Sequence, residues 1–320
     1  MEIEKFDSLQ HKDFRIIMSC YAGSQLYGTT TELSDVDIRG VFIPTPEYFL
    51  GFLHRIEQIE LPEDTVYYDI RKFLNLCLQC NPSIIGLLFT PAECMIYSTW
   101  EWDVIVKNRQ LFLSKKARYT FAGYAVSQLH RIKRHRNWLL HPPAKQPKRS
   151  DFGLPEDRTL VTKDQLNAFD ELTNTFNHDL VRDFNLDANA LQVLQQEKAF
   201  LNANKEWKQY ENWKKERNPK RAELETKFGY DTKHASHLYR LVTEGKELLL
   251  TGHITLPRPD ANVLLDIRNG KYTYDELMSM TGDIDTVFDK LYEQSILPHK
   301  PDSNKADELC VRLVKGGMEE

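Results

Sequence analysis

The stretch AGSQLYGTTTELSDVDIRG, residues 22–40, decides how the rest of the chain is interpreted. It contains Gly23-Ser24 and then, after ten residues, two aspartates, Asp35 and Asp37, separated by one residue. Side chains alternate along a β-strand, so two aspartates at this spacing are expected on one face, close enough to share divalent cations. Because neighbouring carboxylates repel each other and are costly to desolvate, the pair requires a cation, and Mg²⁺ suits such hard oxygen ligands.

Gly23 and Ser24 supply the complementary half of a phosphate-handling site. A glycine allows the backbone to come close to a phosphate, and a serine hydroxyl, with N–H groups at a following helix start, can hold polyphosphate oxygens. Neither a Gly-Ser dipeptide nor an Asp-x-Asp pair is specific when it occurs alone. Their combination at this spacing predicts a phosphate-binding turn and a metal pair on adjacent elements.

The flanking sequence predicts an α+β fold. Strand-like apolar segments occupy the N-terminal third, and helical periodicity follows. Strands are expected at 15–21, 36–43, 55–61 and 65–70, and helices at 71–80, 83–89, 102–113, 117–140, 162–184, 188–217 and 232–250. We expect a mixed sheet with flanking helices over 1–115 and a mainly helical lobe over 116–320. This lobe would contain a Pro-rich basic linker near 141–155 and an insertion at 156–225.

The composition of the 320 residues, 41% hydrophobic and 28% charged, is that of a water-soluble globular protein. No run reaches the roughly 18 apolar residues of a spanning helix, and the start, MEIEKFDSLQHKDF, has charges where a signal peptide needs an apolar run. The five cysteines lack the spacing of a zinc site and are expected to be free thiols. The protein is therefore expected in the cytoplasm, without a membrane partner.

Charge is distributed unevenly along the chain. Residues 104–150 hold twelve of the 42 Lys and Arg residues, whereas all 47 Asp and Glu residues lie outside this segment. Such segregation is typical of a surface that binds a polyanion. The alternative is a basic face that is neutralised by an acidic face of the same protein.

The residues quoted so far resemble the nucleotidyltransferase superfamily that includes DNA polymerase β, CCA-adding enzymes and aminoglycoside nucleotidyltransferases. The superfamily signature is Gly-Ser followed by Asp-x-Asp, which Gly23, Ser24, Asp35 and Asp37 match. Four longer blocks are similar to one branch, the predicted nucleotidyltransferase family of bacteria and phages associated with RNA-repair ligases. These blocks are GSQLYGTTTELSDVDIRGVFIP, YDIRKFLNLCLQCNPSIIGLLF, FAGYAVSQLHRI and YDTKHASHLYRLVTEGKELLLTG.

The resemblance implies a polymerase β-like core that transfers a nucleoside monophosphate from an NTP to a hydroxyl and releases pyrophosphate. Asp35 and Asp37 would hold two Mg²⁺ ions, for which Mn²⁺ can substitute, and Gly23 and Ser24 would hold the triphosphate. A third carboxylate completes the superfamily site. Asp69, at the end of an expected strand, is the predicted third ligand or base, with Asp64 as the rival and helix capping as the alternative role of Asp69.

The last block predicts a helix with a cationic stripe. Lys233, His237, Arg240 and Glu244 recur at three- and four-residue steps and share a face. Lys233, His237 and Arg240 are expected to bind the nucleotide, as cationic residues on second-lobe helices do in similar enzymes. The alternative is an ordinary solvated face.

The basic helix expected at 117–140 predicts a nucleic-acid partner. Arg131, Lys133, Arg134 and Arg136 cannot all face one side of a helix, so part of this set is expected to be available for phosphates. The expected acceptor is an RNA end, with tRNA among the candidates, and the resemblance implies functional association with an RNA ligase. The alternatives are transfer to a protein hydroxyl (AMPylation), a small-molecule acceptor, and a nucleic-acid-binding module without catalysis.

Overall fold

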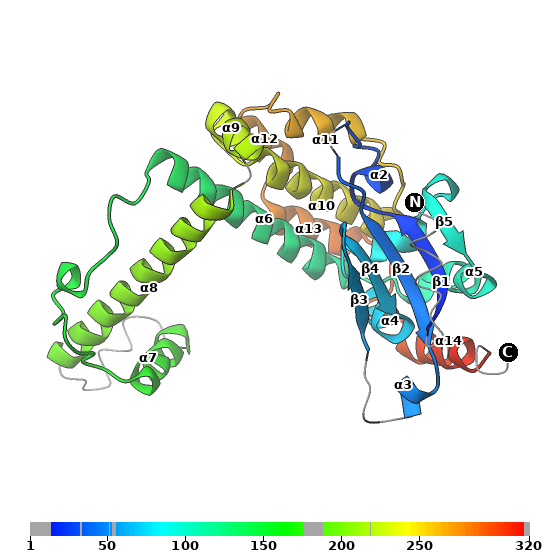
Figure 1. Ribbon diagram of the computed structural model, residues 1–320, viewed down its shortest axis with the longest axis horizontal. Coiled ribbons are helices and arrows are strands. Elements are labelled where there is room, and N and C mark those ends of the chain that lie inside the picture. Colours follow the sequence, from blue (N-terminus) through cyan, green and yellow to red (C-terminus); the bar gives the residue numbers. More distant parts are fainter. Residues whose placement is uncertain are drawn as a thin grey trace. The chain divides into compact units, whose positions relative to one another are not determined.

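The N-terminal strands form one five-stranded sheet, seen in a computed structural model that describes residues 14–32, 34–50, 52, 56–175, 188–217 and 219–316 (Figure 1). The strands are β1 (Phe14–Tyr21), β2 (Ile38–Pro44), β3 (Gln58–Leu61), β4 (Thr65–Asp69) and β5 (Met95–Ser98). Their order is β3-β4-β2-β1-β5. Only β2 and β4 pair in parallel, so the sheet is mixed, as expected. The sequence analysis missed β5.

The interior of the sheet is apolar because helices cover it. Residues 16–20 of β1 and 40–44 of β2 are buried without interruption, the pattern of strands that are covered on both faces. Helix α4 (Ile70–Leu78) packs on β2 and β4, and α5 (Trp100–Lys107) packs on β1. This confirms the α+β core with flanking helices.

Strand β2 begins two residues later than expected. Asp35 and Asp37 lie in the irregular segment before Ile38, so they do not alternate within a regular strand. The Ala22 N–H still donates to the Asp37 carbonyl oxygen at 2.8 Å, which extends the pairing of β1 and β2 by one bond. Asp35 and Asp37 therefore lie just outside the sheet, where β1 ends and β2 begins.

The remaining structure is mainly helical, as expected. The short helices of the core are α2 (Gly23–Tyr27) and α3 (Glu47–Leu50), with 3₁₀ helices at Ile85–Phe89, Ala92–Cys94 and Arg109–Leu111. The others are α6 (Ala117–Leu140), α7 (Lys163–Thr175), α8 (Ala188–Glu216), α9 (Pro219–Phe228), α10 (Thr232–Thr251), α11 (Ala261–Arg268), α12 (Tyr274–Thr281), α13 (Ile284–Gln294) and α14 (Ser303–Gly316).

The chain divides differently from the expected 1–115 and 116–320. One unit comprises 1–133 together with 230–320, and the other comprises 134–229. The C-terminal helices belong to the unit of the sheet because they contact its flanking elements: α14 packs on α4, and the Lys115 N–H donates to the Pro298 carbonyl oxygen at 2.8 Å. The expected insertion, 156–225, lies within the second unit.

The second unit is built from helices, with its own buried aromatic residues. Trp138 and Tyr210 are buried, and the ring of Trp213 lies 5.4 Å from that of Trp138. Arg149 of the basic run pairs with buried Glu197 at 2.5 Å, and that partner lowers the pKa of Glu197. This part of the basic segment is therefore neutralised inside the protein, and the aromatic residues of α8 pack as a core.

None of the helices in the described part of the chain combines the length and the apolar character needed to cross a membrane. The N-terminal segment 1–13, on which the signal-peptide argument rested, lies outside the described residues. The five cysteines are free, as expected.

Candidate active site

Gly23 brings the first turn of α2 into contact with Asp37. Gly23 has φ +53°, in the left-handed region that favours glycine. A Cβ atom at this position would lie 1.7 Å from Oδ2 of Asp37, so any other residue would overlap the carboxylate. The sequence suggested that this glycine makes room for a phosphate, but the group that approaches it in the structure is the carboxylate of the motif itself.

Asp64 faces Asp37 from the neighbouring strand. The parallel pairing places Ile38 of β2 opposite Thr65 of β4, so the residues just before the two strands meet. The pKa of the Asp37 carboxyl is raised, first by burial and further by the negative charge of Asp64 and a hydrogen bond with it, while Arg39 opposes this shift. Asp37 is half-buried, whereas Asp35 and Asp64 are exposed. Asp37 and Asp64 thus meet just before the starts of β2 and β4, and Asp35 precedes Asp37 by two residues.

Asp69, the predicted third carboxylate, lies at the opposite end of β4. It pairs in register with Phe42, whereas the aspartates of the motif precede Ile38. Its side chain is 1% exposed, accepts the Arg71 backbone N–H at 2.7 Å and forms an ion pair with the Arg71 guanidinium at 2.7 Å. Asp69 therefore caps α4, and the placement of Asp69 beside Asp37 is corrected in favour of its rival, Asp64.

Arg39 holds the turn that carries Asp64. One guanidinium nitrogen of Arg39 donates to the carbonyl oxygens of Ile38, at 2.8 Å, and of Asp64. Asp64 itself has φ +53°, a conformation that aspartate adopts more readily than most side chains. The turn between β3 and β4 is thus fastened to the start of β2, which fixes the distance between the acidic residues.

The cationic residues of α10 have different surroundings from one another. Lys233 is exposed, and its charge acts on Asp37, which places it beside the acids. The pKa of His237 falls to about 3 because of burial and then the charges of Arg240, His234, Lys233 and Arg131, so this imidazole is neutral.

Arg240 contacts Glu244 of its own helix and Tyr27 of α2. Its side chain pairs with buried Glu244 at 2.8 Å and lies over the Tyr27 ring at 3.9 Å. Burial raises the pKa of Tyr27 to about 12. Arg240 thus supports α2, and its contact with the nucleotide stays a prediction.

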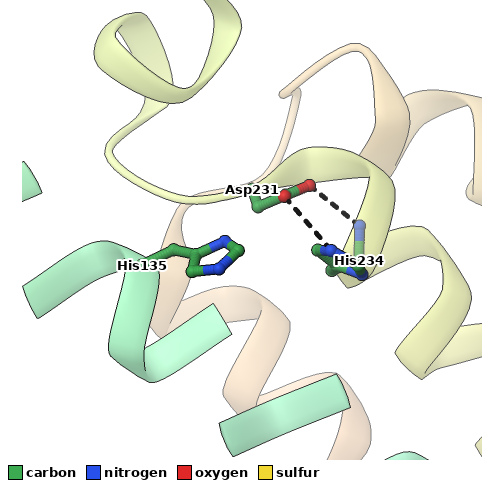
Figure 2. Close-up of side chains that lie close together, drawn as sticks. All are labelled: His135, Asp231 and His234. Carbon is green, nitrogen blue, oxygen red and sulfur yellow. Dashed lines mark hydrogen bonds and ion pairs between the residues drawn. The ribbon is translucent and has the colours of Figure 1, made fainter. Parts of the chain in front are cut away.

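The start of α10 contains residues that the sequence analysis overlooked. Asp231 caps the helix by accepting the His234 backbone N–H at 3.0 Å, and its carboxylate lies 3.5 Å from Nε2 of the same residue (Figure 2). Nδ1 of His234 lies 2.8 Å from Oε1 of Gln128 on α6. The Asp231-Thr-Lys-His sequence, an Asp directly before a helix, was the available signal.

The four basic residues predicted to bind nucleic acid are divided between the two units. Arg131 and Lys133 are exposed on the first unit. In the second unit, Arg134 donates to Gln209 at 3.0 Å, and Arg136 donates to the Gly229 carbonyl oxygen at 2.8 Å. Arg131 and Lys133 are therefore the better candidates for contacts with phosphates.

The chain is similar to known protein sequences. Over 307 residues the chain is 24% identical to an uncharacterized 38.9 kDa protein from the nrdC-mobD intergenic region of Enterobacteria phage T4, which covers 84% of this chain and 87% of the phage protein. No solved structure matches the chain. Residues 2–140, which include the acidic residues, the glycine turn and all of α6, match the RNA repair pathway DNA polymerase beta family. The N-terminal part of the chain is therefore similar to that family.

Proposed function

We propose that the protein is a metal-dependent nucleotidyltransferase that moves a nucleoside monophosphate from an NTP to a hydroxyl at an RNA end. The observation that carries this proposal is the Asp37–Asp64 pair, in which Asp37 lies against Gly23 and the turn of Asp64 is held by Arg39. The family description, RNA repair pathway, supports an RNA acceptor, and functional association with an RNA ligase is part of the same proposal.

The acidic residues suit hard divalent cations. Two carboxyl groups that share a hydrogen bond, with the pKa of one raised, repel each other when both are ionised, and bound cations relieve that repulsion. Asp35, Asp37 and Asp64 would hold two Mg²⁺ ions, with Mn²⁺ as a substitute. When bound, these ions supply charge neutralisation to the triphosphate and acidify the acceptor hydroxyl.

The protein's own groups then have distinct tasks. Ser24 and Lys233 would bind the phosphates that leave, and the cation of Lys233 would offset their charge. Asp64 would accept the proton of the acceptor hydroxyl. The acceptor oxygen forms a bond to the α-phosphorus, the bond from the α-phosphorus to the bridging oxygen breaks, and pyrophosphate departs.

The test is label transfer. The purified protein is incubated with Mg²⁺ and each α-³²P-labelled NTP in turn, with and without tRNA and short RNAs, and RNA and protein are resolved on separate gels. We expect label in RNA for the wild type and for the matched control Glu63→Gln, and none for Asp37→Asn or Asp64→Asn. Label on protein alone would replace this proposal with AMPylation, and label nowhere would favour the binding module or a small acceptor.

A further inference from the structure

Helix α6 presents one edge to the candidate active site. Tyr124 and Arg131 are seven residues apart, which places them on the same side of the helix, about 10 Å apart along its axis. Both are exposed, with Tyr124 at 41%. Gln128 lies between them, and its contact with His234 directs this edge toward the start of α10.

The Arg131 end of this edge is near groups of the active site, and the Tyr124 end contacts the core. The charge of Arg131 reaches His237, on the helix that brings Lys233 to Asp37. The hydroxyl of Tyr124 accepts a hydrogen bond from the Asn81 side chain at 3.2 Å. Asn81 follows α4 (Ile70–Leu78), so the Tyr124 end of this edge lies beside the chain that leaves α4.

The edge is suited to a polyanion. Helix α6 contains five Lys or Arg residues and no Asp or Glu. Arg118, near the start of α6, forms ion pairs with Asp285 and Asp289 and lies on another side of the helix. Arg131 forms no ion pair with an acidic residue in the described part of the chain, and it is the exposed cation of this edge.

We propose that the single-stranded end of the RNA acceptor lies along this edge of α6, with Arg131 binding a backbone phosphate next to the reacting hydroxyl and Tyr124 stacking on a base further from the end. An exposed aromatic ring beside a cation is the usual combination for single-stranded nucleic acid. The distance between the two residues spans about three stacked nucleotides at roughly 3.4 Å each. This inference rests on the proposed function and names its acceptor as an unpaired strand.

Helix α6 itself provides the control for stacking. Tyr119 is more exposed than Tyr124, at 60%, but it lies five residues earlier and so about 140° around the helix. It packs against Tyr292 of α13. Tyr119→Ala removes an exposed ring of the same kind from the same helix without touching the proposed edge, and Lys107→Gln removes an exposed cation from α5.

The experiment measures transfer kinetics and RNA binding by Tyr124→Ala, Tyr124→Phe, Arg131→Gln and the two controls. The acceptors are an RNA hairpin with an unpaired four-nucleotide 3′ end and the same hairpin with a blunt end. For Tyr124→Ala we expect KM for the unpaired acceptor to rise roughly tenfold and KM for the NTP to stay unchanged, with recovery in Tyr124→Phe. For Arg131→Gln we expect the slope of log Kd against log salt for that RNA to fall by about 1. The controls should behave as the wild type.

The outcomes separate this inference from the function on which it rests. Wild-type transfer to RNA with unchanged KM in Tyr124→Ala and an unchanged salt slope in Arg131→Gln would overturn the edge of α6 alone. Equal use of the blunt and unpaired acceptors would overturn the unpaired strand. Absence of label in any RNA with the wild type would overturn the proposed function, and this inference with it.

Discussion

Strand β4 has an aspartate near each end, and the two have opposite surroundings. Asp69 is buried, pairs with Arg71 and accepts a backbone N–H at the start of α4. Asp64 is exposed, has a left-handed backbone conformation and faces another carboxylate. At the Asp69 end of β4, a guanidinium and a backbone N–H of the protein offset the negative charge. At the Asp64 end, two carboxyl groups are held together.

This contrast shows how a structural acid differs from a functional one. A carboxylate with a guanidinium and an N–H as partners stabilises the fold, because both partners favour its charged form. Two facing carboxylates destabilise each other and persist only because the surrounding chain fixes them. Asp37 and Asp64 are fixed by the Gly23 turn and by Arg39, which act on the backbone of the two segments.

The largest expected effect comes from neutralising the facing pair. We expect Asp37→Asn and Asp64→Asn each to lower nucleotidyl transfer by about a thousandfold, because each removes a ligand for the cations that offset the charge of the transition state. The melting temperature should stay the same or rise, since the repulsion between the carboxylates is lost. Transfer assays and thermal melts on the same preparations would test this, and a variant with near wild-type transfer would contradict the role of that residue.

The next effect concerns the contact that brings Asp37 into place. Gly23→Ala would place a methyl group on Oδ2 of Asp37 and force a left-handed backbone on alanine, at a cost of about 1–2 kcal/mol. We expect transfer to fall about a hundredfold because the carboxylate must move. Gly123→Ala, on the exposed side of α6, where a Cβ meets nothing within 4 Å, is the control and should retain activity.

At the other end of β4, the expected effect is on stability. Asp69→Ala should lower the free energy of unfolding by about 2 kcal/mol, because it removes a helix cap and an ion pair with a partly exposed arginine. Asp69→Asn retains a capping oxygen and should cost less. Denaturant unfolding measures both. Loss of transfer in Asp69→Asn, with its stability intact, would reverse the assignment of the two acids.

The smallest effect is a pH dependence of stability that arises from His237. Its pKa is about 3 in the folded protein and near 6.5 in the unfolded chain, so below pH 6.5 the unfolded chain takes up a proton that the folded protein does not. Stability should therefore fall by about 1 kcal/mol between pH 6.5 and 5.5 from this group alone. His237→Gln should remove that part of the slope, and identical slopes in both proteins would contradict the buried, neutral imidazole.

The sequence was sufficient for the α+β core and for the pairing of a glycine turn with two aspartates. It could not locate the third carboxylate, because an aspartate just before a strand and an aspartate at its last residue give the same kind of local sequence pattern. The parallel pairing of β2 with β4 decides the matter: parallel strands bring their starts together, so Asp64 and not Asp69 meets Asp37. That pairing depends on long-range contacts that local patterns do not encode.

The residues of α10 give a second example of a sequence pattern that fits two different structures. Three cations at helical spacing predict a shared face, and that face exists. Arg240, however, is followed four residues later by Glu244, and the two are buried as a pair beneath α2. A solvated stripe and a buried pair have the same spacing, so the division between Lys233 and Arg240 required the tertiary structure.

The residues that support α2 come late in the chain, which affects when α2 can be stabilised during synthesis. Tyr27 contacts Arg240 through its ring and Arg258 through its carbonyl oxygen, and Gly28 packs against Pro257, all more than 200 residues later in the sequence. While the chain emerges from the ribosome, its glycine turn lacks this support until most of the protein has been translated. A product that ends before Arg240 would carry every residue of the motif but would lack this support of α2.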